Sequence, residues 1–189
     1  GTTAGRYLER RGEGGYMLIL QVAEAVELES ARRRLDRLGI RVVWEGQREG
    51  TRGLHLHPRD VGGAILSLDH SDPPGSWAWA GKGWESAVGR SSVEGIVAAE
   101  IGAEDPAALA RRWGEVLDRP ATEASDRWTI ELDGGALSFA PLGPDRTAGL
   151  RAIDLTCVDR EGVEARARAR GIESEGGGVV LGGVLFRLV

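Results

Sequence analysis

TRGLHLHPRDVGGAILSLD, residues 51–69, contains two segments of alternating apolar and polar residues, at 54–57 and 65–69. Such period-two alternation is typical of strands that bury one face. Ahead of it lie GYMLILQV (15–22), a helical segment and RVVWEG (41–46). The helical segment shows apolar residues at spacings of three and four, namely Leu28, Ala31, Leu35 and Leu38. The order of strand, helix and three strands predicts a βαβββ unit with its helix on the outer face of a sheet.

The same order recurs twice further along the chain. The second unit is expected to have strands at 93–101, 127–132 and 136–140 around a helix at 106–117, which Asp105 would cap. The third is expected to have a strand at 150–158, a helix at 160–170 and strands near 179–181 and 184–189. The expected fold class is therefore α+β, with repeated βαβββ modules forming cup-shaped mixed β-sheets and helices on the outside.

Residues 2–69 resemble a known superfamily. The lead LERRGEGG (8–15) and the run HPRDVGGAILSL (57–68) are similar in amino-acid sequence and spacing to the second module of methylmalonyl-CoA epimerases and glyoxalase-like proteins. These belong to the vicinal oxygen chelate superfamily, which has the glyoxalase, bleomycin resistance and dioxygenase fold. The resemblance implies that modules pair edge to edge, two of them closing one cup.

This pairing rule divides the chain as follows. Residues 1–71 are a βαβββ module, 72–92 a linker rich in Trp, Pro and Gly, 93–142 a second module and 149–189 a third, short module that pairs with the second. The first module then has no partner module within this sequence. It is expected to pair with an N-terminal module missing from this sequence or with another subunit, as in a homodimer.

The resemblance also implies where a metal would bind. In the superfamily a His, Gln or Glu on the first strand of a module and a Glu on the last strand hold the metal. Those positions fall here on residues that divalent cations do not favour as ligands, namely Met17, Ser67, Gly95, Ser138, Ala152 and Arg187. No metal is expected in this region, and a divalent metal would require ligands from an N-terminal module. His55 and His57, two apart on an expected strand and about 7 Å from each other, are the remaining metal candidates.

Other residues are candidates for ligand binding. Trp77, Trp79 and Trp84 lie in DPPGSWAWAGKGWES (72–86) and make up half of the six tryptophans. They either form a strap that fills the seam between units, or a lid whose indoles stack on a flat ligand while Lys82 or Arg90 meets an anionic group.

The acidic candidates are Asp154 and Glu131, which period two could place on inward faces of their strands. An Arg partner or a hydrogen bond is the expected role for each of them rather than a metal. Catalytic residues stay unknown, because no GxSxG, HExxH or CxxC motif occurs. Cys157, on an expected strand, is taken as a buried small hydrophobe.

The amino-acid composition limits which binding partners and which cellular compartment are expected. The net charge of −5 argues against nucleic acid, and no apolar run of about 18 residues could span a membrane. One cysteine, without a partner for a disulfide, is typical of a reducing compartment, so the protein is expected to be cytoplasmic. Lysine occurs once and asparagine never, a usage typical of a high-GC bacterial genome.

The functional expectation is a glyoxalase-like protein that binds a small anionic or aromatic metabolite in a β-cup, with a degenerate metal site. The alternative is a metal-dependent lyase, isomerase or dioxygenase whose ligands lie mainly in an absent N-terminal module. The first requires no cofactor, and the second requires a divalent cation.

Overall fold

The computed structural model describes residues 2–89, 92–143 and 147–189. The first unit contains α1 (Thr3–Arg11), β1 (Met17–Val22), α2 (Ala25–Arg37), β2 (Val42–Arg48), β3 (Thr51–Leu56), α3 (Pro58–Val61) and β4 (Ile65–Ser71). Two short 3₁₀ helices follow, η1 (Ala78–Ala80) and η2 (Trp84–Ala87). The second unit contains β5 (Val93–Ala103), α4 (Pro106–Leu117), β6 (Ala121–Ala124), β7 (Arg127–Leu132) and β8 (Gly135–Pro141). The third contains β9 (Gly149–Cys157), α5 (Arg160–Ala169), β10 (Ser174–Glu175), β11 (Gly178–Leu181) and β12 (Val184–Leu188).

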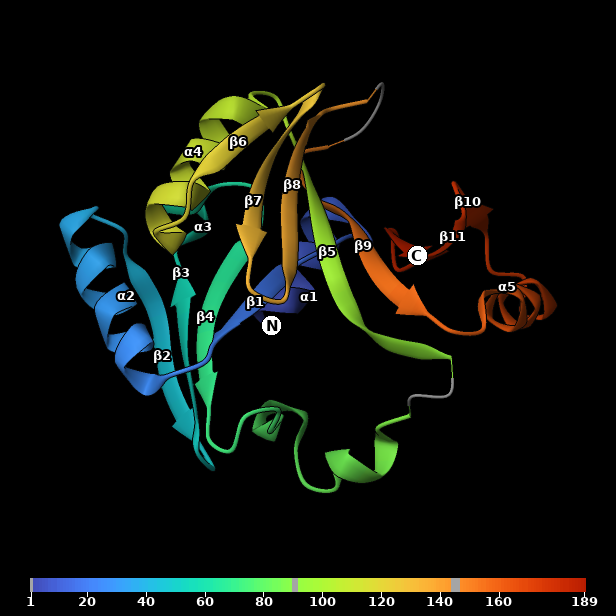
Figure 1. Ribbon diagram of the computed structural model, residues 1–189, viewed down its shortest axis with the longest axis horizontal. Coiled ribbons are helices and arrows are strands. Elements are labelled where there is room, and N and C mark those ends of the chain that lie inside the picture. Colours follow the sequence, from blue (N-terminus) through green and yellow to red (C-terminus); the bar gives the residue numbers. More distant parts are fainter. Residues whose placement is uncertain (1, 90–91, 144–146) are drawn as a thin grey trace.

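The strands form two sheets (Figure 1). The first unit forms a four-stranded sheet in the order β1-β4-β3-β2, in which β1 runs parallel to β4. The second and third units share an eight-stranded sheet in the order β10-β11-β12-β9-β5-β8-β7-β6. Its two halves meet where β5 and β9, the first strands of their units, pair antiparallel. The predicted α+β fold class with mixed sheets is confirmed.

The helices form where the sequence supplies a cap and an apolar stripe. Asp105 accepts a hydrogen bond from the Ala108 amide at 2.9 Å, and Pro106 opens α4 where a free N–H is not needed. In α2 the buried residues are Leu28, Ala31 and Leu35, the stripe seen in the sequence. Burying such stripes against the sheets supplies the main stabilisation of the fold.

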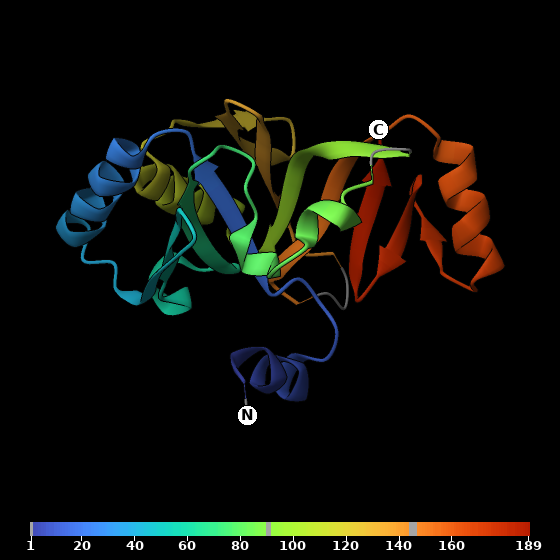
Figure 2. The same cartoon turned by 90° about the horizontal axis from the view of Figure 1, so that it is seen from below.

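The two sheets are joined by a continuous apolar core. Trp113 of α4 is fully buried, packs edge-on against Phe139 at 5.6 Å between ring centroids, and donates a hydrogen bond to the Gly62 carbonyl at 3.3 Å. Arg34 of α2 adds a hydrogen bond to the Val116 carbonyl at 2.9 Å. Figure 2 shows the first unit lying against α4, with α5 at the far end of the eight-stranded sheet.

Several short elements were not predicted. β6 and β10 are mostly exposed and carry no apolar alternation, and α3 is a single turn that begins after His57. The third unit has four strands, like the second. Cys157 ends β9, the strand on which it was expected, and is half-buried there. Within the described residues no helix combines the length and the apolar character needed to cross a membrane.

Candidate functional site

Four charged side chains meet on the face of the eight-stranded sheet that lies opposite α4, which we call the inner face. Glu100 of β5 accepts hydrogen bonds through the same carboxylate oxygen from Arg187 of β12 at 3.1 Å and from Arg127 of β7 at 3.4 Å. Arg187 also donates through Nε to Asp154 of β9 at 2.5 Å. These four residues, from four strands, are the charge cluster.

The sheet register explains why these side chains meet. Arg187 lies directly across from Asp154, and Glu100 lies across from Ala152. Directly opposed residues on adjacent strands share a face. Neighbours of Glu100 in β5, such as Ile101, point the other way into the core beneath α4. The charge cluster is therefore fixed by strand pairing, which favours a precise geometry.

Burial makes the charge cluster energetically important. Glu100 is only 8% exposed, although it is an ionisable residue, and such residues stay buried only when they are paired. Burial lowers the pKa of Arg187, but its hydrogen bonds to Asp154 and Glu100 outweigh that effect, so the pKa is raised overall. Two cations and two anions make the charge cluster neutral in sum.

Positions that the resemblance assigned as metal ligands in the second and third units lie next to this cluster. Ser138 and Ala152 flank Glu100 across the sheet, and Arg187 contacts it directly. Gly95 lies further along β5 near its exposed beginning. Three of the four positions that the resemblance assigned in the second and third units therefore come together in space.

The donor set does not fit a divalent metal. A guanidinium carries a permanent positive charge and no acceptor, and it stands where a carboxylate ligand would be needed. Both carboxylates of the charge cluster are engaged by arginines. Across the described residues, no three His, Cys, Asp or Glu side chains are grouped so that they could hold a metal ion.

Glu131, the other acidic candidate, is on β7 and is exposed. It pairs in register with Ala136, whereas Arg127 lies at the start of the same strand. By alternation the two share a face, but the structure does not bring Glu131 into the charge cluster. Glu100 and Arg127 were missed by the sequence reasoning. The signal for Glu100 was a lone acid within the apolar run AAEIGA at 98–103.

A second polar group lies on the face of the four-stranded sheet that points away from α2. Asp69 of β4 is 2% exposed and accepts hydrogen bonds from the hydroxyl of Ser67 and from the indole Nε1 of Trp79 at 2.8 Å. Gly53 lies opposite Asp69, and a Cβ there would come within 3.0 Å of the carboxylate oxygens. The missing side chain makes room for the carboxylate and the indole above it.

Aromatic rings complete this group. Trp44 of β2 stacks on His55 at 4.3 Å between ring centroids and meets Trp79 edge-on at 5.6 Å. His57, by contrast, lies past the end of β3 and caps α3 by accepting a hydrogen bond from the Arg59 amide at 3.1 Å. β3 ends at Leu56, so His57 lies one residue beyond it, where its amide donates a hydrogen bond to the Arg41 carbonyl at 2.9 Å.

Burial lowers the pKa of His55 below its ordinary value of 6.5, and the nearby Asp69 carboxylate only partly opposes this effect by raising it. The unfolded chain therefore binds a proton more readily than the folded protein as the pH falls through about 6.5. We expect the free energy of unfolding to decrease between about pH 7.5 and about pH 5.5. Urea denaturation at both pH values checks this, and His55→Gln should show a smaller decrease. Equal decreases in the two proteins would contradict the assignment.

The remaining linker candidates are spread along the connection. Trp77 is 38% exposed, Trp84 is half-buried and Lys82 is exposed. Arg90 lies outside the described residues. His70, the residue that follows the expected strand at 65–69, lies in β4, with a buried Nδ1 that has no hydrogen-bond partner among the described residues. Of the three linker indoles, Trp79 is the one placed against a buried acid.

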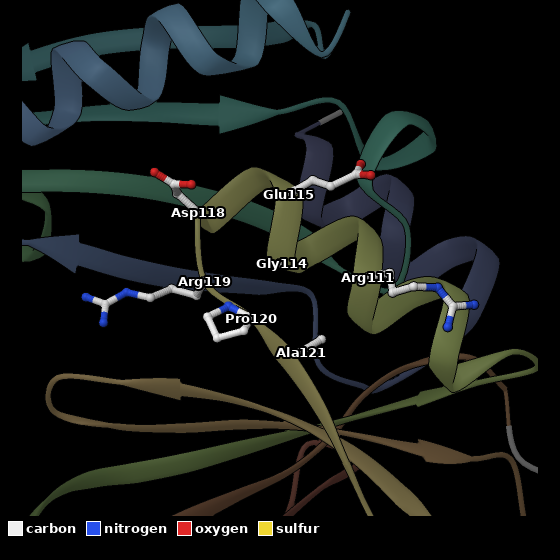
Figure 3. A pocket seen from close by; sticks show the side chains of 7 residues that line it. All are labelled: Arg111, Gly114, Glu115, Asp118, Arg119, Pro120 and Ala121. Atoms are coloured by element: carbon white, nitrogen blue, oxygen red, sulfur yellow. The ribbon is translucent and has the colours of Figure 1, made fainter.

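Hollows also lie elsewhere on the described part of the chain. One is open and has a volume of about 460 Å³. Figure 3 shows it at the end of α4, with Asp118 and Arg119 on one side and Arg111 on the other. Asp118 pairs with Arg34 at 3.3 Å and Arg119 with Asp133 at 2.6 Å, whereas Arg111 lies over the Trp128 ring at 5.3 Å from its centroid. A larger groove of about 1000 Å³ separates β1 from β5 and the β7–β8 hairpin.

This architecture was compared with those of known proteins. No protein-family model and no curated protein sequence matches the chain. The fold is nevertheless shared with solved structures, among them those of a glyoxalase and a catechol dioxygenase.

A hypothetical protein from Staphylococcus aureus gives a TM-score of 0.64 at 10% identity, over 100% of this chain and 70% of that one. The Mn(II)-bound glyoxalase from Novosphingobium aromaticivorans gives 0.61 at 13% identity, over 90% and 60%. A catechol 2,3-dioxygenase gives 0.60 at 16% identity, over 93% and 68%. The chain thus spans between 60% and 70% of the length of these proteins, and the likeness is one of fold.

Proposed function

We propose that this chain is a glyoxalase-like protein of the vicinal oxygen chelate superfamily that binds a small anionic metabolite on the inner face of its eight-stranded sheet. The arginines of the charge cluster would orient the ligand, and no metal would be held by the residues of this region. The similarity of residues 2–69 to epimerase sequences supports the superfamily assignment. It does not favour any particular reaction.

One observation carries this proposal. At the last-strand ligand position of the third unit stands Arg187, whose guanidinium is bonded to both carboxylates of the charge cluster. Arginine presents five N–H donors in a planar fork that matches a carboxylate, so an arginine-containing site suits an anion better than a cation. Arg127, whose side chain is 42% exposed, is the member most open to a ligand.

The ligand test uses two probes, benzoate and malonate, in thermal melting. Both should raise the melting temperature of the purified protein, because a ligand that binds only the folded state stabilises it. Arg127→Gln should reduce this response. The matched control is Arg111→Gln, because Arg111 lies over the Trp128 ring on the helix side of β7, at 5.3 Å from the centroid. An equal response in all three proteins would contradict the proposed site.

The alternative is a metal-dependent lyase, isomerase or dioxygenase with ligands from a further module, which the shared fold of a Mn(II)-bound glyoxalase favours. Metal analysis by plasma mass spectrometry, on protein purified without chelator or His tag, separates the two. We expect substoichiometric metal and a melting temperature unchanged by EDTA. A stoichiometric metal that EDTA removes with loss of stability would overturn the metal-free reading.

A further inference from the structure

The face of the four-stranded sheet that points away from α2, which we call the Asp69 face, carries a row of buried polar side chains. Of the five buried polar or charged residues in the described part of the chain, four lie on this face, namely Thr51, Ser67, Asp69 and Ser71. The hydroxyls of Thr51 and Ser71 contact each other at 3.0 Å. A sheet face that served packing alone would be apolar, because buried polar groups are costly.

Asp69 is a buried carboxylate without a positive partner. It is 2% exposed, and its hydrogen bonds come from two neutral donors, the Ser67 hydroxyl and the Trp79 indole. No Arg or Lys of the described residues forms an ion pair with it. Glu100, by contrast, is less deeply buried and is bonded by two arginines. Buried carboxylates are ordinarily paired with a cation, so Asp69 lacks the group that would compensate its charge.

The basic residues of the neighbouring strand β3 do not supply this charge. Arg52 precedes Gly53, the residue opposite Asp69, so its side chain lies on the other face of the sheet, where it pairs with Glu29 at 2.5 Å. His55 does lie on the Asp69 face. Burial lowers its pKa, which the Asp69 carboxylate raises only in part, so the imidazole is neutral at pH 7. The compensating cation is therefore not among the described residues.

The carboxylate of Asp69 can accept a further hydrogen bond. A carboxylate offers about four lone-pair positions, and the Ser67 hydroxyl and the Trp79 indole use one on each oxygen. Gln21, directly across from Asp69 on the edge strand β1, is exposed and forms no hydrogen bond within the described residues. It lines the groove of about 1000 Å³ that separates β1 from β5. A turn of the Gln21 side chain therefore connects Asp69 with the groove.

The walls of this groove suit the apolar part of an organic cation. They include Ile19 of β1, and Ile96 and Val97 of β5, which are 63% and 36% exposed. Three acidic residues and two arginines line the groove, so its charge favours a cation. The indole of Trp79 adds an aromatic face, to which ammonium groups are attracted. A metal ion fits less well, because the described residues gather no three acids, histidines or cysteines around Asp69.

We propose that the Asp69 face binds a small organic ammonium ion, whose charged nitrogen donates to Asp69 and whose apolar part lies in the groove along β1. The indole of Trp79 and the ammonium group share one carboxylate, so the indole N–H weakens the binding of the ion. This site is on a different sheet from the charge cluster and takes a ligand of opposite charge. It does not depend on the proposed function.

Thermal melting at pH 7 with 2-phenylethylamine, which is protonated at this pH, tests the proposal. The amine should raise the melting temperature, and 2-phenylethanol, an uncharged probe of the same shape, should need a concentration at least about tenfold higher for the same shift. Asp69→Asn keeps an oxygen for the Trp79 indole and should also need about tenfold more amine. Asp36→Asn removes the same charge from an exposed position of α2 and should respond like the wild-type protein. Equal responses to amine and alcohol, or of Asp69→Asn and wild type to the amine, overturn the proposal.

Trp79→Phe covers the case in which Asp69→Asn fails to fold. Phenylalanine keeps an aromatic ring but cannot donate a hydrogen bond, so Asp69 has one donor fewer and should bind the amine about fivefold more tightly. Arg127→Gln, which should reduce the response to benzoate, should leave the response to the amine unchanged. Binding of the amine that is no tighter in Trp79→Phe than in the wild-type protein, or that is lost in Arg127→Gln, overturns a separate cation site at Asp69.

Discussion

Replacing Arg187 with methionine should lower the free energy of unfolding by about 3 kcal/mol, the lower end of the cost of breaking a buried ion pair from one side. Methionine keeps much of the side-chain volume but leaves Glu100, at 8% exposure, with Arg127 alone at 3.4 Å. Asp154 loses its partner as well. The lower end of the range applies because the Arg187 and Asp154 side chains are 26% and 22% exposed. Urea denaturation at pH 7 measures the change.

Two further variants show whether the loss of stability comes from leaving the Glu100 carboxylate without Arg187. Arg127→Met should cost about 1 kcal/mol, because that side chain is more exposed and its contact is longer. Adding Glu100→Gln to Arg187→Met should recover part of the loss, since an amide is cheaper to bury than an unpaired charge. A double variant less stable than the sum of its single changes would contradict this account.

Replacing Trp79 with alanine should also lower the free energy of unfolding by about 3 kcal/mol in the absence of any ligand. The change removes an indole packed against Trp44 and takes away a hydrogen-bond donor from Asp69, which is 2% exposed. A buried acceptor that loses a donor adds its own desolvation cost. Such a loss is expected of a strap, whereas a lid would matter mainly with ligand bound.

Matched linker variants keep this test specific. Trp77→Ala, in the same segment but 38% exposed, should change stability by less than about 1 kcal/mol. Trp79→Phe should keep part of the packing and lose only the hydrogen bond, giving an intermediate value. If Trp79→Ala melts like the wild-type protein and alters only a response to benzoate, the linker acts as a lid.

The fold was accessible from the sequence because its signals are local. The buried face of α2 is indicated by the spacing of Leu28, Ala31 and Leu35. The start of α4 is indicated by Asp105 followed by Pro106. Elements without a local signal were missed. β6 is four residues long, mostly exposed, and held in place by pairing with β7.

The charge cluster could be predicted only in part, because its geometry is non-local. Asp154 was singled out from alternation within one strand, and an Arg partner or a hydrogen bond was expected for it. Which arginine it meets depends on the register between β9 and β12. Glu100 was missed, since its burial is acceptable only with arginines that lie 27 and 87 residues later in the sequence. Asp69 was likewise missed, although it shares one strand face with Ser67.

The large sequence separation between members of the charge cluster affects how the protein folds during translation. During synthesis Glu100 leaves the ribosome well before Arg187, its partner 87 residues later. Until β12 emerges, the nascent eight-stranded sheet lacks both its last parallel pairing and the counter-ion that makes a buried Glu100 tolerable. Contacts of such large sequence separation are slow to form because the intervening chain must first be ordered. The inner face therefore takes its final form only after translation has passed β12, and until then the nascent chain exposes strand edges that chaperones can cover.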